Sequence, residues 1–148
     1  MNRLLFYATD KPYGEFSNFS RHAITVDGLS WPTSEHYFQA QKFAGTPFEE
    51  EVRAQLTPML AAQMGRRRDL PFRADWDAVK DDIMRAALHA KFTQHPELRA
   101  LLLGTDDAIL VEHTRNDAYW ADGGDGSGRN RLGELLMELR AALRRRDD

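Results

Sequence analysis

The segment from Trp31 to Phe43 constrains the fold more than any other, because it defines where a helix begins. Pro32 rules out an earlier start of that helix. The hydroxyl of Thr33 or Ser34 can accept hydrogen bonds from the first free N–H groups of the helix. The sequence therefore predicts a helix whose first residue lies directly after Thr33 or Ser34.

Three polar residues of this helix fall on one face. Glu35, Gln39 and Lys42 are spaced i, i+4 and i+7, which places them within about 60° of one another. Rings surround this stripe at His36, Tyr37, Phe38 and Phe43. Two interpretations are open. The stripe is either a solvated face with a carboxylate near the positive end of the helix dipole, or an acid and an amine in an aromatic pocket.

The rest of the chain predicts a helix-rich fold with a few short strands. Asp27-Gly28, a pair that the type I′ turn favours, separates two short strands of a predicted hairpin at 24–31. Further buried strands are expected at 4–8 and 108–113, and helices at 47–55, 57–64, 75–92, 96–103 and 132–143. Strands and helices do not alternate regularly, so the predicted class is α+β, with one domain over 1–148 and a small sheet of short strands.

Composition indicates a globular protein. The 148 residues are 42% hydrophobic and 29% charged, which is enough chain for one sizeable core. No apolar run approaches the roughly 20 residues that cross a bilayer, and the charged N-terminal segment does not resemble a signal peptide. We therefore expect a cytoplasmic protein with no membrane partner.

Composition also excludes several kinds of chemistry. The absence of cysteine rules out disulfides, thiolate catalysis and zinc sites built on cysteine. The five histidines lack the spacing of metal ligands, so neither a metal nor another cofactor is expected. A net charge of −3 gives no overall basic field for binding a nucleic acid backbone.

A glycine-rich loop from Tyr119 to Asn130 is the second informative stretch. Four glycines within residues 123–128 let the backbone approach a ligand closely, and the loop leads into the start of a helix, which suits a phosphate. The loop matches neither the P-loop, nor the dinucleotide fingerprint, nor the EF-hand. It is either a flexible surface loop or the wall of a pocket. Trp120 close to Asp122 favours a pocket that stacks a base and hydrogen-bonds it.

Taken together, the motifs resemble the YbiA-like, or NADAR, domain family, in the same order along nearly the whole chain. The matching segments are 13–19, 31–43, Gly65-Arg66, 73–80, 119–123, 130–133 and 135–137. One departure is Ala121, where the family is expected to have glycine between the tryptophan and the aspartate. That change removes backbone freedom but no functional group.

The resemblance implies an N-glycosidase that cleaves the C–N bond at the anomeric carbon of a ribose. Two substrate classes are associated with the family. One consists of the phosphoribosylamino-pyrimidine intermediates of riboflavin synthesis, and the other is ADP-ribose attached to guanine, including guanine in nucleic acid. The expected partner is therefore a small ribosyl, phosphoribosyl or ADP-ribosyl molecule, or an ADP-ribosylated nucleic acid. A non-catalytic module that binds ADP-ribose or a related nucleotide is the alternative from another class.

The resemblance also assigns a site to the matching residues. Catalytic roles fall to Glu35, Lys42 and Asp122. Substrate contacts are expected from Phe16, Ser17, Asn18, Arg66, Trp76, Trp120, Gly123, Gly124 and Asn130. In this assignment the tryptophans wall the base, the polar side chains hydrogen-bond the base or ribose, and the arginine and glycines hold phosphate.

Two catalytic routes stay open. In the first, Glu35 and Asp122 form a carboxylate pair like that of ordinary glycosidases. In the second, burial lowers the pKa of Lys42 enough for its amine to attack the sugar carbon and form a Schiff base with the opened ribose. Glu35, on the same helix face, then moves the protons. We favour the second route.

Overall fold

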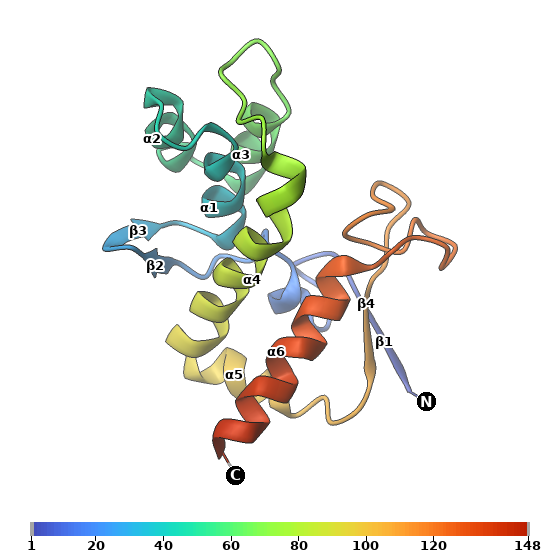
Figure 1. Cartoon of the computed structure of the whole chain (residues 1–148). Helices are drawn as coiled ribbons and strands as arrows, with labels where there is room; N and C mark the ends of the chain where they lie inside the picture. Colours follow the sequence, from blue (N-terminus) through green and yellow to red (C-terminus); the bar gives the residue numbers. More distant parts are fainter. Residues whose placement is uncertain (1, 148) are drawn as a thin grey trace. The chain divides into compact units, whose positions relative to one another are not determined.

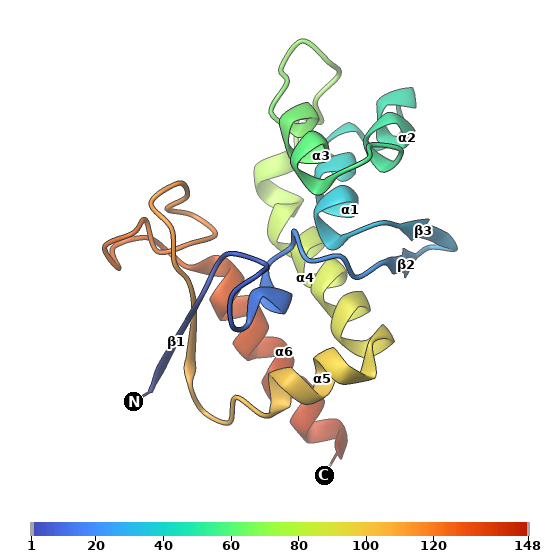
Figure 2. The ribbon, with the colours of Figure 1, turned by 180° about the vertical axis from the view of Figure 1, so that it is seen from behind.

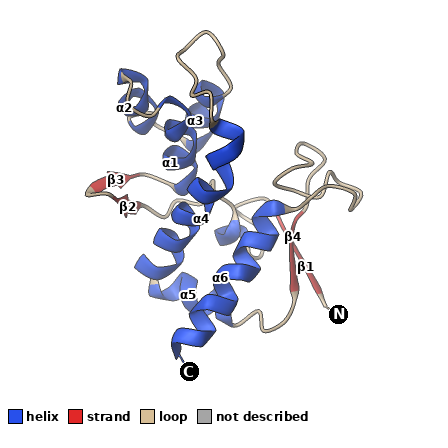
Figure 3. Cartoon of the chain, viewed as in Figure 1, coloured by secondary structure: helices blue, strands red, loops and turns tan. Residues whose placement is uncertain are grey.

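A computed structural model describes residues 2–147 of the chain (Figure 1). The α-helices and strands in chain order are β1 (Arg3–Phe6), β2 (Ile24–Val26), β3 (Leu29–Trp31), α1 (Ser34–Ala40), α2 (Pro47–Arg53), α3 (Pro58–Gly65), α4 (Trp76–Gln94), α5 (Pro96–Leu103), β4 (Ile109–Glu112) and α6 (Arg131–Asp147). Two short 3-10 helices, η1 and η2, span Gly14–Phe16 and Gln41–Phe43. Helices dominate (Figure 3), and the predicted helix-rich α+β fold is confirmed.

The chain divides into two compact units. One unit holds the described residues up to Ser17 together with those from Phe92 onward, and the other holds Asn18 to Lys91. The expectation of a single domain over 1–148 stays a prediction.

In the Asn18–Lys91 unit, the predicted hairpin is confirmed. Strands β2 and β3 pair antiparallel, with Ile24 opposite Trp31 and Val26 opposite Leu29. Asp27 and Gly28 have φ angles of 52° and 81°, the positive values that a type I′ turn requires. The turn leads into β3, and α1 begins three residues after β3 ends.

Helix α1 begins where the sequence predicts. The hydroxyl of Thr33 accepts a hydrogen bond from the backbone N–H of His36 (3.1 Å). The His36 ring in turn bonds the same hydroxyl (2.7 Å) and the carbonyl oxygen of Gln55 (2.9 Å), which ties α1 to the segment after α2. The helix tightens into η2 at Gln41, so Lys42 lies on a 3-10 turn directly after α1.

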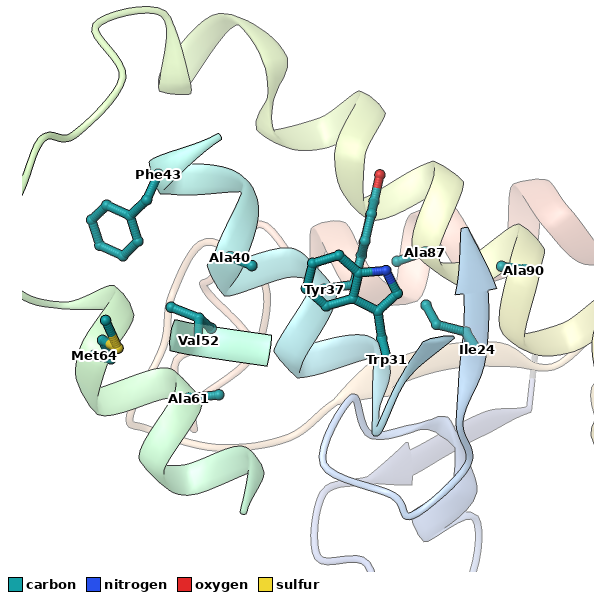
Figure 4. Packing of buried hydrophobic residues seen from close by; sticks show 10 residues of the cluster. All are labelled: Ile24, Trp31, Tyr37, Ala40, Phe43, Val52, Ala61, Met64, Ala87 and Ala90. Atoms are coloured by element: carbon teal, nitrogen blue, oxygen red, sulfur yellow. The ribbon is translucent and has the colours of Figure 1, made fainter. Parts of the chain in front are cut away.

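The core of this unit gathers around α1 (Figure 4). Its buried members come from the hairpin, from η2 and from helices α1 to α4, and they are Ile24, Trp31, Tyr37, Ala40, Phe43, Val52, Ala61, Met64, Ala87 and Ala90. The rings of Trp31 and Tyr37 meet edge to face with their centres 5.3 Å apart. Because α1 is enclosed by these elements, all of its residues are buried.

In the other unit, β1 and β4 pair in parallel and lie side by side (Figures 1 and 2). The sequence predicts a buried strand at 4–8. The observed strand is Arg3–Phe6, and only Phe6 is buried, while Leu5 and Tyr7 are 50% and 47% exposed. The prediction of a buried strand is therefore wrong, because one face of β1 stays open to solvent.

The other predicted elements of this unit are confirmed. A long loop connects the end of β4 to the start of α6 (Figure 2). Within residues 2–147, no helix combines the length and apolar character needed to cross a membrane.

Candidate functional site

The polar stripe on α1 and η2 is buried. Glu35, Gln39 and Lys42 are each only 8% exposed. The interpretation of this stripe as a solvated helix face is therefore wrong. An acid, an amide and an amine that are buried together need partners, because an uncompensated buried charge is costly.

Each of these side chains has a defined contact. Gln39 donates from Nε2 to Oε2 of Glu35 (2.8 Å), and Lys42 donates from Nζ to the carbonyl oxygen of Gly65 (3.3 Å). The oxygen of the Gln39 amide, Oε1, is buried and has no hydrogen bond within the described chain. It lies against Gly65, where an added Cβ would be 1.9 Å from Oε1. The Gly65 carbonyl thus accepts the hydrogen bond from Lys42. Because Gly65 has no side chain, it also leaves room for the Gln39 amide that bonds Glu35.

Aromatic rings shield the Lys42 amine from water. Its Nζ lies 5.6 Å from the ring centre of Trp76 and 6.0 Å from that of Phe38. These two rings meet edge to face with their centres 5.0 Å apart. Trp76 is itself buried at the first turn of α4, so it both packs in the core and faces the amine.

Burial is the main reason that the pKa of Lys42 is lowered, to about 8. The positive charges of Arg68, Arg66 and Lys80 lower the pKa further, whereas the negative charge of Glu35 raises it. With a pKa of about 8, roughly one Lys42 side chain in ten is neutral at pH 7. An exposed lysine offers far less neutral amine, so Lys42 is suited to nucleophilic attack near neutral pH.

Replacing Gly65 with alanine is expected to disturb both Glu35 and Lys42, because the new Cβ would overlap the Gln39 amide. We expect a loss of about 1–3 kcal/mol in the free energy of unfolding from overpacking, measured by urea denaturation. Turnover should fall roughly tenfold to a hundredfold, because small misplacements of catalytic groups are costly.

Gly104→Ala is the matched control. Gly104 caps the end of α5, and a Cβ added there would lie 3.2 Å from its nearest neighbouring atom, compared with 1.9 Å at Gly65. A Gly65→Ala protein as stable and as active as the wild type would contradict a role for Gly65 in holding Gln39.

Asn18 lies beside the start of α1. Its Oδ1 accepts a hydrogen bond from the hydroxyl of Ser34 (2.8 Å), and its Nδ2 contacts the sulfur of Met84 (3.3 Å). Its backbone carbonyl accepts from the N–H of Glu35 (3.2 Å). Arg66 directly follows α3 and is exposed, with no side-chain hydrogen bond to another described residue. The Asn18–Lys91 unit therefore brings together five of the predicted site residues, namely Asn18, Glu35, Lys42, Arg66 and Trp76.

Asp122 organises the glycine-rich loop of the other unit. Its Oδ1 accepts hydrogen bonds from the N–H groups of Thr114 (3.1 Å) and Gly124 (2.8 Å), and its Oδ2 lies 2.7 Å from Nδ1 of His113. Burial opposes ionisation of this carboxyl group, but these hydrogen bonds outweigh it and hold its pKa below the usual value. The carboxylate is thus ionised and saturated by local donors, while His113 remains half-exposed.

The loop around Asp122 is held by further backbone contacts. Asn130 accepts from the N–H of Glu112 (3.0 Å) and donates to the carbonyl of Leu110 (2.9 Å), which fixes the loop to β4. Gly123 and Gly124 have positive φ angles, and an added Cβ at Gly124 would lie 2.8 Å from Arg115. Hydrogen bonds and close backbone contacts therefore hold this loop against β4.

The aromatic residues of this unit differ in their exposure. Trp120 is partly buried, and its ring meets that of Tyr119 edge to face at 4.9 Å. Phe16 is fully buried between the rings of Phe6 and Phe92, and the adjacent Ser17 is also buried. That Phe16 and Ser17 contact substrate stays a prediction. So does a pocket that combines site residues of the two units.

Three features of these sites have no local signal in the sequence: His113 beside Asp122, Gly65 against Gln39, and Arg68, which also bonds the Gly65 carbonyl (2.9 Å). All depend on contacts between residues that are separated along the chain or on a glycine without a side chain, so spacing gives no signal for them. Within residues 2–147, no group of three or more histidine, aspartate or glutamate side chains lies where it could hold a metal ion.

Comparisons with known proteins bear on this arrangement. Residues 5–144 match the family described as the NADAR domain. The chain is 62% identical to N-glycosidase YbiA of Escherichia coli (strain K12) over 138 residues, which cover 93% of this chain and 86% of that protein. It is 41% identical to riboflavin biosynthesis protein VVA0006 of Vibrio vulnificus, over 95% of this chain and 38% of that longer protein.

The fold also matches a solved structure. The NMR structure of the Escherichia coli protein YbiA superposes with a TM-score of 0.92 at 59% identity, over 99% of this chain and 87% of that one. The predicted resemblance is therefore confirmed in both sequence and fold.

Proposed function

The chain belongs to the NADAR domain family, and we propose that this N-glycosidase hydrolyses phosphoribosylamino-pyrimidine intermediates of riboflavin synthesis with Lys42 as its nucleophile. One observation carries the proposal: a buried amine with a pKa of about 8 shares a helix face with a buried carboxylate. An amine that is partly neutral near pH 7 is able to attack an anomeric carbon, and a nearby carboxylate is able to transfer the protons that the reaction needs.

The reaction begins when the neutral Lys42 amine forms a bond to C1 of the ribose and the bond from C1 to the departing nitrogen breaks. The proton that the amine loses passes through Glu35 to that nitrogen, so the base leaves neutral. The ribose ring then opens as the C1–O4 bond breaks, O4 takes the remaining proton of the attacking amine, and C1 is left double-bonded to the Lys42 nitrogen. Water adds to C1 and displaces the lysine, which releases the free sugar and restores both residues.

The charges near Lys42 favour a phosphorylated substrate. Arg66, Arg68 and Lys80 all act on the amine electrostatically, against the single negative charge of Glu35. This local excess of positive charge occurs in a chain whose net charge is −3. A sugar that carries phosphate therefore has a complementary surface here, and the exposed Arg66 is free to contact it.

Names of relatives support the pyrimidine class. The Vibrio vulnificus protein is named for riboflavin biosynthesis, and this chain is 41% identical to part of it. We carry that substrate class to this chain as part of the proposal. ADP-ribosyl-guanine presents the same three chemical parts, a base, a ribose and phosphate, and so defines the competing class for the test.

The hydrogen bonds of Asp122 support the lysine route over a carboxylate pair. Both Asp122 oxygens already have partners in the loop, at Thr114, Gly124 and His113. A carboxylate held in this way is better suited to shaping the loop and orienting His113 than to attacking a sugar. We therefore propose a supporting role for Asp122 and the nucleophilic role for Lys42.

The test is to incubate the protein with a phosphoribosylamino-pyrimidine and, separately, with an oligonucleotide that carries ADP-ribosyl-guanine. Released base or released phosphosugar is followed by chromatography. We expect release from the pyrimidine substrate at a rate at least about a hundredfold above the enzyme-free reaction, since N-glycosidic cleavage is accelerated by both covalent and acid–base catalysis.

Cleavage of the ADP-ribosyl substrate alone would move the assignment to that class. Binding of ADP-ribose in calorimetry without cleavage of either substrate would overturn the enzymatic proposal in favour of a binding module.

A further inference from the structure

The carbonyl oxygen of Gly65 is shared by two cationic side chains. Lys42 donates to it from Nζ (3.3 Å), and Arg68 donates to it from Nη1 (2.9 Å). Gly65 is the last residue of α3, and carbonyl groups at the end of a helix attract positive charge. The two donors therefore approach the same oxygen and lie within two hydrogen-bond lengths of each other.

Arg68 is fixed in this position by contacts on both sides. The carbon at the centre of its guanidinium lies 4.1 Å from the ring centre of Phe72, and Nη1 also donates to the carbonyl of Arg67 (3.0 Å). The Phe72 ring meets the ring of Trp76, which faces the Lys42 amine. Arg68 is thus attached, through a carbonyl and through a chain of rings, to the groups that surround Lys42.

We propose that Arg68 is a positioning residue for Lys42, because its guanidinium takes the shorter bond to the Gly65 carbonyl and its charge disfavours a second cation there. The Lys42 amine is consequently held in place and kept available in the neutral form. The value of this arrangement for catalysis rests on the proposed function, in which that amine attacks the sugar.

The other charged groups near Lys42 do not account for the effect of Arg68 on the pKa of Lys42. Arg66 and Lys80 act in the same direction as Arg68, and Glu35 acts in the opposite direction. Arg68 exerts the largest of these charge effects, second only to burial. Arg68 also donates a hydrogen bond to the Gly65 carbonyl that Lys42 contacts, and solvent at its exposed side limits the size of its effect.

The experiment measures the pKa of Lys42 directly in the protein without substrate. Lysine side chains are labelled with ¹³C at Cε, the Lys42 signal is identified by its loss in Lys42→Met, and its shift is followed from pH 6 to 11. Arg68→Gln is expected to raise the pKa of Lys42 by about half to one pH unit above the value of about 8. Arg68→Lys keeps the charge and should restore at least half of that change.

Arg67→Gln is the matched control. Arg67 is the adjacent arginine, but its guanidinium is paired with Asp69 (2.7 Å) and is not among the groups that act on Lys42. Its removal should leave the pKa of Lys42 within about two tenths of the wild-type value.

An unchanged pKa in Arg68→Gln would overturn the inference, and so would an equal change in Arg67→Gln. The pH profile of turnover provides the second readout. If Lys42 is the nucleophile, the acidic limb of kcat/KM shifts to higher pH in Arg68→Gln by the same amount as the pKa. A Lys42 pKa that moves while the profile stays in place would support the positioning role and reject Lys42 as the nucleophile.

Discussion

Replacing Lys42 with methionine is expected to abolish N-glycosidic cleavage and to make the protein more stable. The loss in kcat should be roughly a thousandfold or more, because removal of a nucleophile eliminates the covalent route. Methionine has a similar length and is apolar, so it can fill the space between Phe38 and Trp76. Release of base from the substrate by the two proteins, at equal concentration and pH 8, provides the measurement.

The gain in stability follows from the pKa of Lys42. Because the pKa of Lys42 is about 8 in the folded chain and 10.5 for an ordinary lysine, as in the unfolded chain, the unfolded chain binds more protons between these pH values. The buried lysine therefore lowers the stability of the wild type below pH 8, and this cost disappears as the pH rises past 10.5. Urea denaturation should show Lys42→Met to be more stable by about 2 kcal/mol at pH 7 and by clearly less at pH 10.

Borohydride trapping distinguishes Lys42 from other lysines. Reduction during turnover should attach the sugar covalently to the wild-type protein, since borohydride reduces the C1=N bond of the intermediate. Lys11→Met is the control, because Lys11 is exposed on a loop, and it should form the adduct as the wild type does. Full activity of Lys42→Met, with no adduct in the wild type, would reject the lysine route.

Local sequence signals were sufficient to predict most of the fold. The turn at Asp27-Gly28 and the cap at Thr33 depend on a few neighbouring residues, so their positions can be read from the sequence. The burial of β1 could not be predicted in this way. It depends on what packs against each face of β1, and an apolar run such as Leu4-Leu5-Phe6 looks the same whether both faces are covered or one is open.

The candidate site was predictable only in part. Helical periodicity identifies Glu35, Gln39 and Lys42 as members of one face, but it does not show whether that face is exposed to solvent or buried. That distinction depends on Trp76, which is distant in sequence, and on the fit of Gln39 against Gly65. The role of Arg68 was hidden for the same reason, because it acts through the backbone carbonyl of Gly65.

Replacing Glu35 with glutamine is expected to slow turnover by about a hundredfold to a thousandfold while the fold is retained. Glutamine keeps the size of the side chain, and its amide oxygen can still accept the hydrogen bond from Nε2 of Gln39. Only the negative charge and the ability to carry a proton are lost. Steady-state kinetics at pH 6–9 and a urea denaturation curve measure the two effects.

This substitution also separates two ways in which Glu35 can assist Lys42. The carboxylate raises the pKa of Lys42, so its removal should lower that pKa below about 8 and increase the fraction of neutral amine at pH 7. If Glu35 acted only through its charge, Glu35→Gln would therefore be faster than the wild type at pH 7.

If Glu35 transfers protons to the departing nitrogen, Glu35→Gln should turn over more slowly than the wild type, even though more of its Lys42 amine is neutral. Glu50→Gln serves as the control, since Glu50 is exposed on α2 and paired with Arg53, and it should be as active as the wild type. Turnover by Glu35→Gln at or above the wild-type rate would assign the proton transfer to another group. Such a result would leave Lys42 as the nucleophile, because borohydride trapping tests that role independently.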